Sequence, residues 1–431
     1  MNTGEKIKIR EKFAWAMFDF ANSGYTTVVL TTVFNSYFVS VIAGDLESGT
    51  ATFIWTITIA IANALVLITA PLIGAIADFS ANKKRYLMFS AIGCVIFTAT
   101  LYFTRQGDIT LAIVLVILSS VMFYLGESLI AAFLPEISTP ETIGKISGFG
   151  WTLGYIGGLL VLGLCLVYVD WAQSQNHSAE QYVPITLLIV SVCFALACLP
   201  TFIWLKERGI CSEKPSHLNY AQIGFQRLKQ TWQHAHLYQD FFRFLITLSV
   251  FYCGINTVIV LAAIYAQEVM MFEFQDTIKL ILVVNITAAI GAFLFGFLQD
   301  SLGSAKTLSL TLMIWILAML LAFFTESTTM FWVVANLIGL ALGSSQSAGR
   351  ALIGLFSPAS RNGEFFGLWG LAIKISAIIG PLSYGLISFI SQGNHRVALL
   401  ATTVYFIAGL ILLKTVNEKR GMLVAAQENQ S

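Results

Sequence analysis

The segment GESLIAAFLP at residues 126–135 returns further along the chain as GRALIGLFSP at residues 349–358. The two segments agree at five of ten positions, including the glycine that begins each one and the proline that ends it. A second pair has almost the same offset, because GAIAD at 74–78 corresponds to GFLQD at 296–300. Two matches at nearly one spacing indicate that the chain contains two successive copies of one structural unit.

The composition around these repeats is that of a membrane protein. Of the 431 residues, 57% are hydrophobic and 11% are charged, and the mean hydropathy is +0.78. Soluble domains carry about 25% charged residues. A helix needs about 20 mainly apolar residues to cross the bilayer. Twelve such runs are predicted, at residues 13–43, 51–77, 86–104, 109–133, 145–168, 182–206, 242–268, 277–299, 306–325, 330–353, 364–391 and 396–416.

The distribution of Lys and Arg predicts how these spans are oriented. If the N-terminus is inside, the cytoplasmic segments hold most of the 24 Lys and Arg residues, whereas the outer connectors hold Arg105, Lys279 and Arg396. Because positively charged loops stay on the cytoplasmic side, both termini are predicted to be cytoplasmic. This arrangement requires an even number of spans, and twelve satisfies it.

One long connector divides the chain into an N-terminal six-helix half at 1–206, a linker at 207–241 and a C-terminal six-helix half at 242–431. Apolar linker residues recur at spacings of three or four, which predicts an amphipathic helix on the cytoplasmic leaflet. A tether between the halves is the simpler role for this helix, and a regulatory or partner-binding role stays open. The apolar stripe consists of Ala221, Phe225, Leu228, Trp232 and Ala235.

The duplication itself carries a functional expectation. Two parallel six-helix halves, related by an axis along the membrane normal, can rock about a central cavity. The repeat therefore favours a transporter that works by alternating access over a membrane-bound enzyme.

Three longer motifs carry a family resemblance: WAMFDFANSGYTTVV at 15–29, LPEISTPETIGKISGFGWTLGYIGG at 134–158 and GRALIGLFSPASRNGEFFGLWGLAIK at 349–374. Together they resemble the vacuole-effluxer branch of the major facilitator superfamily, which has fungal autophagy-related amino-acid effluxers and many bacterial relatives. The loop GAIADFSANKKR at 74–85 is similar to the superfamily's signature between its second and third helices, although Phe79 replaces an expected basic residue. The resemblance covers essentially the whole chain. It implies an all-α integral membrane protein of 12 transmembrane helices in two pseudo-symmetric halves, in a bacterial inner (plasma) membrane.

Four ionisable side chains stand out within predicted spans, away from the span ends, namely Asp19, Glu127, Arg350 and Lys374. An ionised group at the bilayer centre costs about 2.5–3.5 kcal/mol on insertion scales. Lys374 is predicted to lie close to the midplane, and the other three are predicted to lie nearer the cytoplasmic ends of their spans. All four are therefore candidate functional residues.

Glu127 and Arg350 occupy equivalent positions of the repeat and carry opposite charges. The family resemblance implies that spans one, four, seven and ten line the central cavity, which would place these two side chains across its cytoplasmic half. We predict that they pair when the cytoplasmic side closes and separate when it opens. A static pair, or an Arg350 that only extends to the membrane interface, is the alternative.

Asp19 shares one helix face with Trp15 and Asn22, because their spacings are four and three residues. A carboxylate and an amide on a cavity wall suit an ammonium group or a proton. Asp19 or Glu127 is therefore a candidate for taking up and releasing a proton during a transport cycle. The alternative role for Asp19 is to cap or brace a neighbouring helix.

Three further residues are candidates for substrate contact. Lys374 could bind a substrate carboxylate, or it could neutralise one of the two acids. Asn256 of span seven and Gln346 of span ten are uncharged, and the resemblance implies that their spans line the cavity.

Asp78 and Asp300 end spans two and eight at equivalent positions of the repeat. The family pattern implies that Asp78 rests against the start of span 11, near residues 364–366, and Asp300 against the start of span five, near residues 147–148. The exposed N–H groups and the dipole at a helix N-terminus stabilise an anion. We expect these contacts to latch the outward-facing state. Further members of this predicted latch are Gly74, a basic cluster of Lys83, Lys84 and Arg85, and Glu136 as a partner for that cluster.

The expected activity is secondary active transport of small organic solutes, amino acids or similar metabolites, by proton-coupled efflux. Export of drugs or siderophore-like compounds is the alternative, and a lipid-modifying membrane enzyme is a remote one, since HAH at 234–236 is the only candidate cluster. No phosphate-binding Gly-Lys motif and no metal-ligand spacing of cysteines occurs, so we expect no cofactor and no metal, with a proton or sodium gradient as the energy source. The predicted partners are a small-molecule substrate and the lipid bilayer. We expect the protein to be a monomer. We expect no nucleic-acid partner, because 24 basic residues nearly balance 23 acidic ones.

Overall fold

The computed structural model describes residues 7–46, 49–208 and 220–429, and within these ranges the chain forms helices and no strands. Twelve helical stretches are long and apolar enough to cross a membrane, so the predicted fold class and number of spans are confirmed. The first half contributes α1 (Ile9–Tyr25) with its continuation to Ile42, α3 (Thr50–Ser80), α4 (Lys83–Thr100), α5 (Ile109–Ala131), α6 (Ile143–Ser174) and α7 (Ala179–Trp204). The second half contributes α9 (Gln239–Glu268), α10 (Phe274–Leu302), α11 (Ser304–Phe324), α12 (Thr328–Phe356), α13 (Asn362–Ile390) and α14 (His395–Leu413).

The first span is not one regular helix. After α1 the backbone widens into π-helical turns at Thr26–Thr31 and Phe38–Ile42, which flank the short α2 (Val33–Tyr37). The hydroxyl of Thr31 donates to the carbonyl of Thr27 at 2.9 Å. Threonine hydroxyls that bond to the preceding turn compete with the helical ladder and bend it, which accounts for the break.

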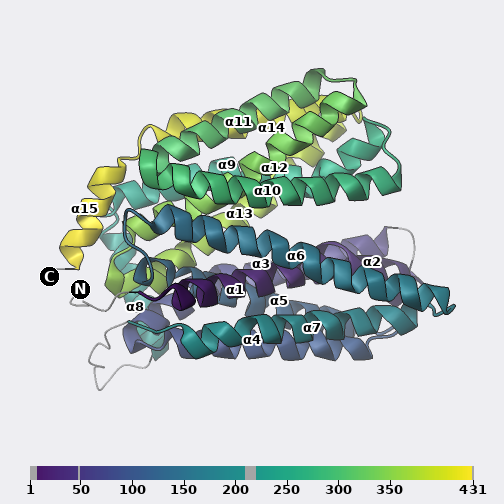
Figure 1. The fold of residues 1–431 in the computed structure, drawn as a ribbon, viewed down its shortest axis with the longest axis horizontal. Coiled ribbons are helices and arrows are strands. Elements are labelled where there is room, and N and C mark those ends of the chain that lie inside the picture. The colour runs from purple at the N-terminus through teal and green to yellow at the C-terminus, as the bar shows by residue number, and fades with distance from the viewer. Residues whose placement is uncertain (1–6, 47–48, 209–219, 430–431) are drawn as a thin grey trace.

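The two halves lie side by side, with α6 and α10 packed against each other between them (Figure 1). Two shorter helices, α8 (Tyr220–Gln233) and α15 (Glu418–Glu428), lie at one end of the bundle, where α1 also begins (Figure 1). We call this the linker end of the molecule.

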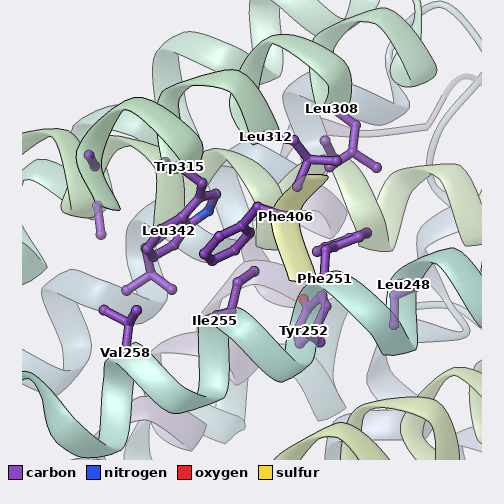
Figure 2. Close-up of a cluster of buried hydrophobic side chains, with 14 of the residues drawn as sticks. Leu248, Phe251, Tyr252, Ile255, Val258, Leu308, Leu312, Trp315, Leu342 and Phe406 are labelled. Carbon is purple, nitrogen blue, oxygen red and sulfur yellow. The ribbon is translucent and has the colours of Figure 1, made fainter. Parts of the chain in front are cut away.

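Each half has its own apolar core. In the first half, Trp15, Phe18 and Tyr25 are buried among residues of α3 to α7. In the second half, the rings of Trp315 and Phe406 stack 4.8 Å apart at an interplanar angle of 7°, within the cluster drawn in Figure 2. The spans of each half are therefore held together by an apolar core that its own residues mostly form. Ala131 and Ala132 of the first half and Ala351 of the second half also pack into the core of the other half.

The linker helix α8 packs on α3, and a Cβ at Gly224 would lie 2.7 Å from the side chain of Leu72. Thr231, on the same helix, donates to the Glu364 carboxylate of α13. Two residues of the predicted apolar stripe, Phe225 and Trp232, remain 58% and 73% exposed. α8 thus touches the protein with one face and presents an aromatic face outward.

Candidate functional site

Asp19 of α1 and Arg350 of α12 form an ion pair that joins the two halves, with Oδ2 and Nη1 2.7 Å apart. Both residues are buried. Arg350 also donates from Nη2 to the Ser147 carbonyl at 2.8 Å and from Nε to the Ser147 hydroxyl at 3.2 Å. The guanidinium therefore connects α1, α6 and α12.

Two indole rings flank this guanidinium. Its Cζ lies 4.6 Å from the ring centroid of Trp15 and 5.2 Å from that of Trp151, and such contacts stabilise a buried cation. A Cβ at Gly150 would lie 2.4 Å from Asp19 Oδ2 and 2.7 Å from Arg350 Nη2. The missing side chain at position 150 therefore makes room for the ion pair.

The predicted pairing of Glu127 with Arg350 is wrong for this structure, because Asp19 and Ser147 accept the hydrogen bonds of the guanidinium. The packing of the helices explains the difference. Both α1 and α12 pack on α6, which brings Asp19 to Arg350, whereas α5, which carries Glu127, packs on α3, α4 and α13. The equivalent positions 127 and 350 of the repeat therefore do not pair where the two halves meet.

Glu127 is instead within electrostatic range of Lys374 of α13, and the charges of Asp19 and Arg350 also act on it. The Lys374 ammonium lies 3.1 Å from the ring centroid of Tyr124 and is 8% exposed. Across the described part of the chain, neither Glu127 nor Lys374 makes a side-chain hydrogen bond or a direct ion pair. An acid of one half and a base of the other half thus interact electrostatically without a direct ion pair.

The uncharged candidates border the same region. Gln346 accepts a hydrogen bond from the hydroxyl of Tyr155 in the other half. Asn22 Oδ1 and Asn256 Nδ2 are buried and have no protein partner within the described ranges. Unpaired buried amides are costly, so these two atoms are available to a ligand or water.

Two aromatic residues of this region had no predicted role. Tyr252 lies one turn before Asn256 on α9, and its buried hydroxyl has no partner among the described residues. Tyr155 lies one turn after Trp151 on α6. Tyr252 is four residues from Asn256, a predicted site residue, and Tyr155 is four residues from Trp151. Because residues four apart share a helix face, these spacings could have identified both tyrosines.

The contact expected of Asp78 is present at the linker end. Its two carboxylate oxygens accept hydrogen bonds from the backbone N–H groups of Gly363 and Glu364, both at 2.9 Å. These residues form the first turn of α13. Lys83 Nζ lies 3.6 Å from Asp78 and also contacts Glu136, so the basic partner of Glu136 is Lys83.

Asp300 makes the corresponding contact in the other direction. It accepts from the N–H groups of Gly144 at 2.8 Å and Lys145 at 3.2 Å, in the first turn of α6. The predicted position near residues 147–148 was therefore one turn too far along the helix. The reason is that α6 begins at Ile143, so its free N–H groups lie before Ser147.

The remaining members of the predicted latch have different surroundings. A Cβ at Gly74 would lie 2.1 Å from the Gly363 carbonyl, so glycine permits the close approach of α3 and α13. Lys84 donates to the Leu205 carbonyl at 2.6 Å and so contacts the end of α7 within its own half. Arg85 is exposed and belongs to neither contact.

Polar contacts between the two halves are confined to the linker-end part of the bundle. Within the described ranges, the contacts that reach furthest into the spans join Tyr155 to Gln346 and the Thr152 hydroxyl to the Ala289 carbonyl. Ion pairs, helix-terminal contacts and glycine contacts lie between these two contacts and Asp78. The structure is therefore closed at the linker end.

Comparison with known proteins decides the family. The family model described as "Vacuole effluxer Atg22 like" matches residues 39–426. The chain belongs to this family.

Relatives within the Atg22-like family come from bacteria and fungi. An uncharacterised transporter of the major facilitator type from Bacillus subtilis, YxiO, is 25% identical over 97% of this chain and 98% of its own length. Autophagy-related protein 22 of Kluyveromyces lactis is 22% identical over 88% of this chain and 82% of its own length.

Solved structures share the architecture. The proton:xylose symporter XylE superposes with a TM-score of 0.75 and 13% identity, covering 98% of both chains. The human organic anion transporter MFSD10 gives a TM-score of 0.71 and 12% identity over 94% of this chain and 99% of its own. These likenesses show that the Atg22-like chain has the major facilitator fold. Its family and its bacterial relative identify it as a membrane transporter and not an enzyme.

Proposed function

We propose that the protein exports small zwitterionic solutes, amino acids or similar metabolites, and that a proton gradient drives the export. The observation that carries the substrate class is the pair of opposed, unjoined charges of Glu127 and Lys374. A zwitterion whose ammonium group meets Glu127 and whose carboxylate meets Lys374 supplies a charged hydrogen-bond partner to each. Such charge-assisted bonds are the strong ones in a dry site.

Glu127 and Lys374 belong to opposite halves, so a solute that binds both favours the state in which the halves approach each other. A ligand shifts a conformational equilibrium only by its differential affinity for the two states. Binding from both halves supplies that difference and couples occupancy to the change of access.

The orientation rests on the distribution of Lys and Arg, which assigns the linker end to the cytoplasm. The closed linker end then corresponds to an outward-facing state. The effluxer name of the family supports export as the direction of transport.

The Asp19–Arg350 pair is the proposed proton switch. A proton that enters from the outer side and binds Asp19 removes the negative partner of Arg350. The closed linker end then loses its deepest ion pair between the halves, and the cytoplasmic side opens to load solute. Release of that proton to the cytoplasm restores the pair and closes the gate again.

Transport assays in proteoliposomes test the proposal. Radiolabelled amino acids are loaded inside the vesicles, and efflux is followed with a pH gradient, with a sodium gradient and without a gradient. We expect efflux of at least one amino acid that accelerates when the outside is made acidic. Acceleration by sodium alone would exclude the proton, and failure of the whole panel would exclude the substrate class.

The aromatic lining favours one second candidate, export of larger aromatic compounds. Trp15 and Trp151 flank the Arg350 guanidinium, and Tyr124 lies against the Lys374 ammonium. A panel of cationic and anionic aromatic drugs belongs in the same assay. Transport of drugs without transport of amino acids would favour this candidate.

A further inference from the structure

A cavity of about 550 Å³ lies away from the interface of the two halves, between α3, α4, α5 and the beginning of α8. Sites for small molecules and cofactors are about 300–1,000 Å³. Among the described residues that line the cavity, Arg85 is the one that was also predicted to belong to the latch, and it makes neither latch contact. The cavity is therefore separate from the candidate transport site and is large enough to hold a ligand.

The lining changes from polar to apolar along the helix axes. Ser80 ends α3, and Asn82 and Arg85 follow it, so the polar part lies at the linker end. Met122 and Leu125 lie on α5 further into the membrane span, Met122 by more than two turns from the helix end at Ala131. A molecule that fits this gradient has a polar head and an apolar chain.

Arg85 gives the polar part its charge. Its side chain is exposed and makes no hydrogen bond or ion pair within the described residues. Its neighbours differ, because Lys83 contacts Glu136 and Lys84 bonds to Leu205. The described lining contains no acidic residue, so the head that fits is an anion.

The side of the cavity is open to the lipid-facing surface of the bundle. Phe89, on the lipid side of α4, lines the cavity and is 67% exposed. Tyr220, which begins α8, lines the cavity from the linker helix and packs against Phe79. An occupant can therefore enter from the bilayer without passing through the transport site.

We propose that this cavity binds one anionic phospholipid from the leaflet at the linker end. The phosphate lies against Arg85, and an acyl chain runs along Met122, Leu125 and Leu129. Basic side chains near a membrane surface attract anionic lipids, and here one unpaired guanidinium lies directly above an apolar groove. The described residues that would contact the occupant belong to the first half and to the start of the linker helix at Tyr220.

Native mass spectrometry of the detergent-solubilised full chain tests the proposal. The protein is titrated with phosphatidylglycerol or with phosphatidylcholine of the same acyl chains, and bound lipids are counted. We expect one phosphatidylglycerol to bind more tightly than phosphatidylcholine. Arg85→Gln should weaken phosphatidylglycerol binding about fivefold, the fold-change for about 1 kcal/mol per basic residue, and Arg85→Lys should restore it.

Two further variants separate a built site from diffuse attraction. Lys229→Gln removes an exposed positive charge from α8 outside the cavity and should leave lipid binding unchanged. Met122→Trp fills the groove and should weaken both lipids, while circular dichroism confirms that each variant is folded. Equal affinity for the two lipids, or equal losses in Arg85→Gln and Lys229→Gln, would overturn the proposal.

Discussion

Asp78 and Asp300 make the same contact in opposite directions across the two halves. Asp78, at the end of α3, accepts two N–H groups from the first turn of α13, and Asp300, at the end of α10, accepts two from the first turn of α6. Each contact needs the halves to be close at the linker end. We therefore expect the two aspartates to stabilise the conformation that is closed at the linker end more than they stabilise the fold.

Asp78→Asn should slow transport about tenfold or more while the protein stays folded. A hydrogen bond to a charged group contributes about 1.5–3 kcal/mol, and each 1.4 kcal/mol is a factor of ten in an equilibrium. The closed linker end loses that contribution, so distances between spin labels on α3 and α13 should lengthen. Asp300→Asn is the matched variant and should act in the same direction. Wild-type rates in both variants would refute the latch.

Gly74→Ala should hold the linker end open. The added methyl group would meet the Gly363 carbonyl at 2.1 Å, which forces α3 and α13 apart. We expect greater labelling of a cysteine introduced near Gly363 in a cysteine-free background. Gly163→Ala is the control, because nothing lies within 4 Å of a Cβ there. Equal labelling in the two variants would show that the close approach does not limit closure.

Removing one member of the Asp19–Arg350 pair should destabilise the protein more than removing both. A buried charge left without its partner costs about 3–5 kcal/mol. Melting temperatures of Asp19→Asn, Arg350→Gln and the double variant form the cycle that measures the coupling. Additive losses would mean that the two charges do not stabilise each other.

The same Asp19→Asn variant tests the proton switch through function. Exchange of labelled for unlabelled solute across the vesicle should continue, whereas acceleration by a pH gradient should disappear. If the gradient still accelerates efflux, the proton is carried elsewhere, and Glu127→Gln is the next variant to assay.

Glu127→Gln and Lys374→Gln should each raise the KM for a zwitterionic solute, by about tenfold or more for the loss of one charge-assisted bond. A solute without a carboxylate should lose less in Lys374→Gln than in Glu127→Gln. Lys229→Gln, on the exposed face of α8, is the control for general loss of positive charge. An unchanged KM in both site variants would remove these residues from the substrate site.

The spans and the equivalence of Asp78 and Asp300 were predictable, because both depend on local patterns. Twenty apolar residues specify a span wherever they occur, and the repeat offset identifies equivalent helix ends. The Arg350 partner was not predictable in this way. Asp19 reaches Arg350 because α1 and α12 both pack on α6, and this packing of distant segments has no local sequence pattern. The pair also needs the space that Gly150 leaves.

Two other features lacked a sufficiently strong local signal. The π-helical turn at Thr26–Thr31 lies within an apolar run that still qualifies as a membrane span, so hydropathy does not reveal it. The C-terminal α15 is short and polar for a membrane protein, and its Glu428 pairs with Arg361 at 2.8 Å, a contact between residues far apart in sequence.

The separate apolar cores have an energetic consequence for switching between conformations. When one half rocks against the other, most of the apolar surface inside each half stays buried. The hydrophobic effect therefore contributes little to the free-energy difference between the outward-facing and inward-facing conformations. The balance is then set by a handful of charges and helix termini. One proton moving through 100 mV of membrane potential releases about 2.3 kcal/mol, which is comparable to one such contact. The membrane potential acting on one proton is therefore sufficient to shift the balance between the two conformations.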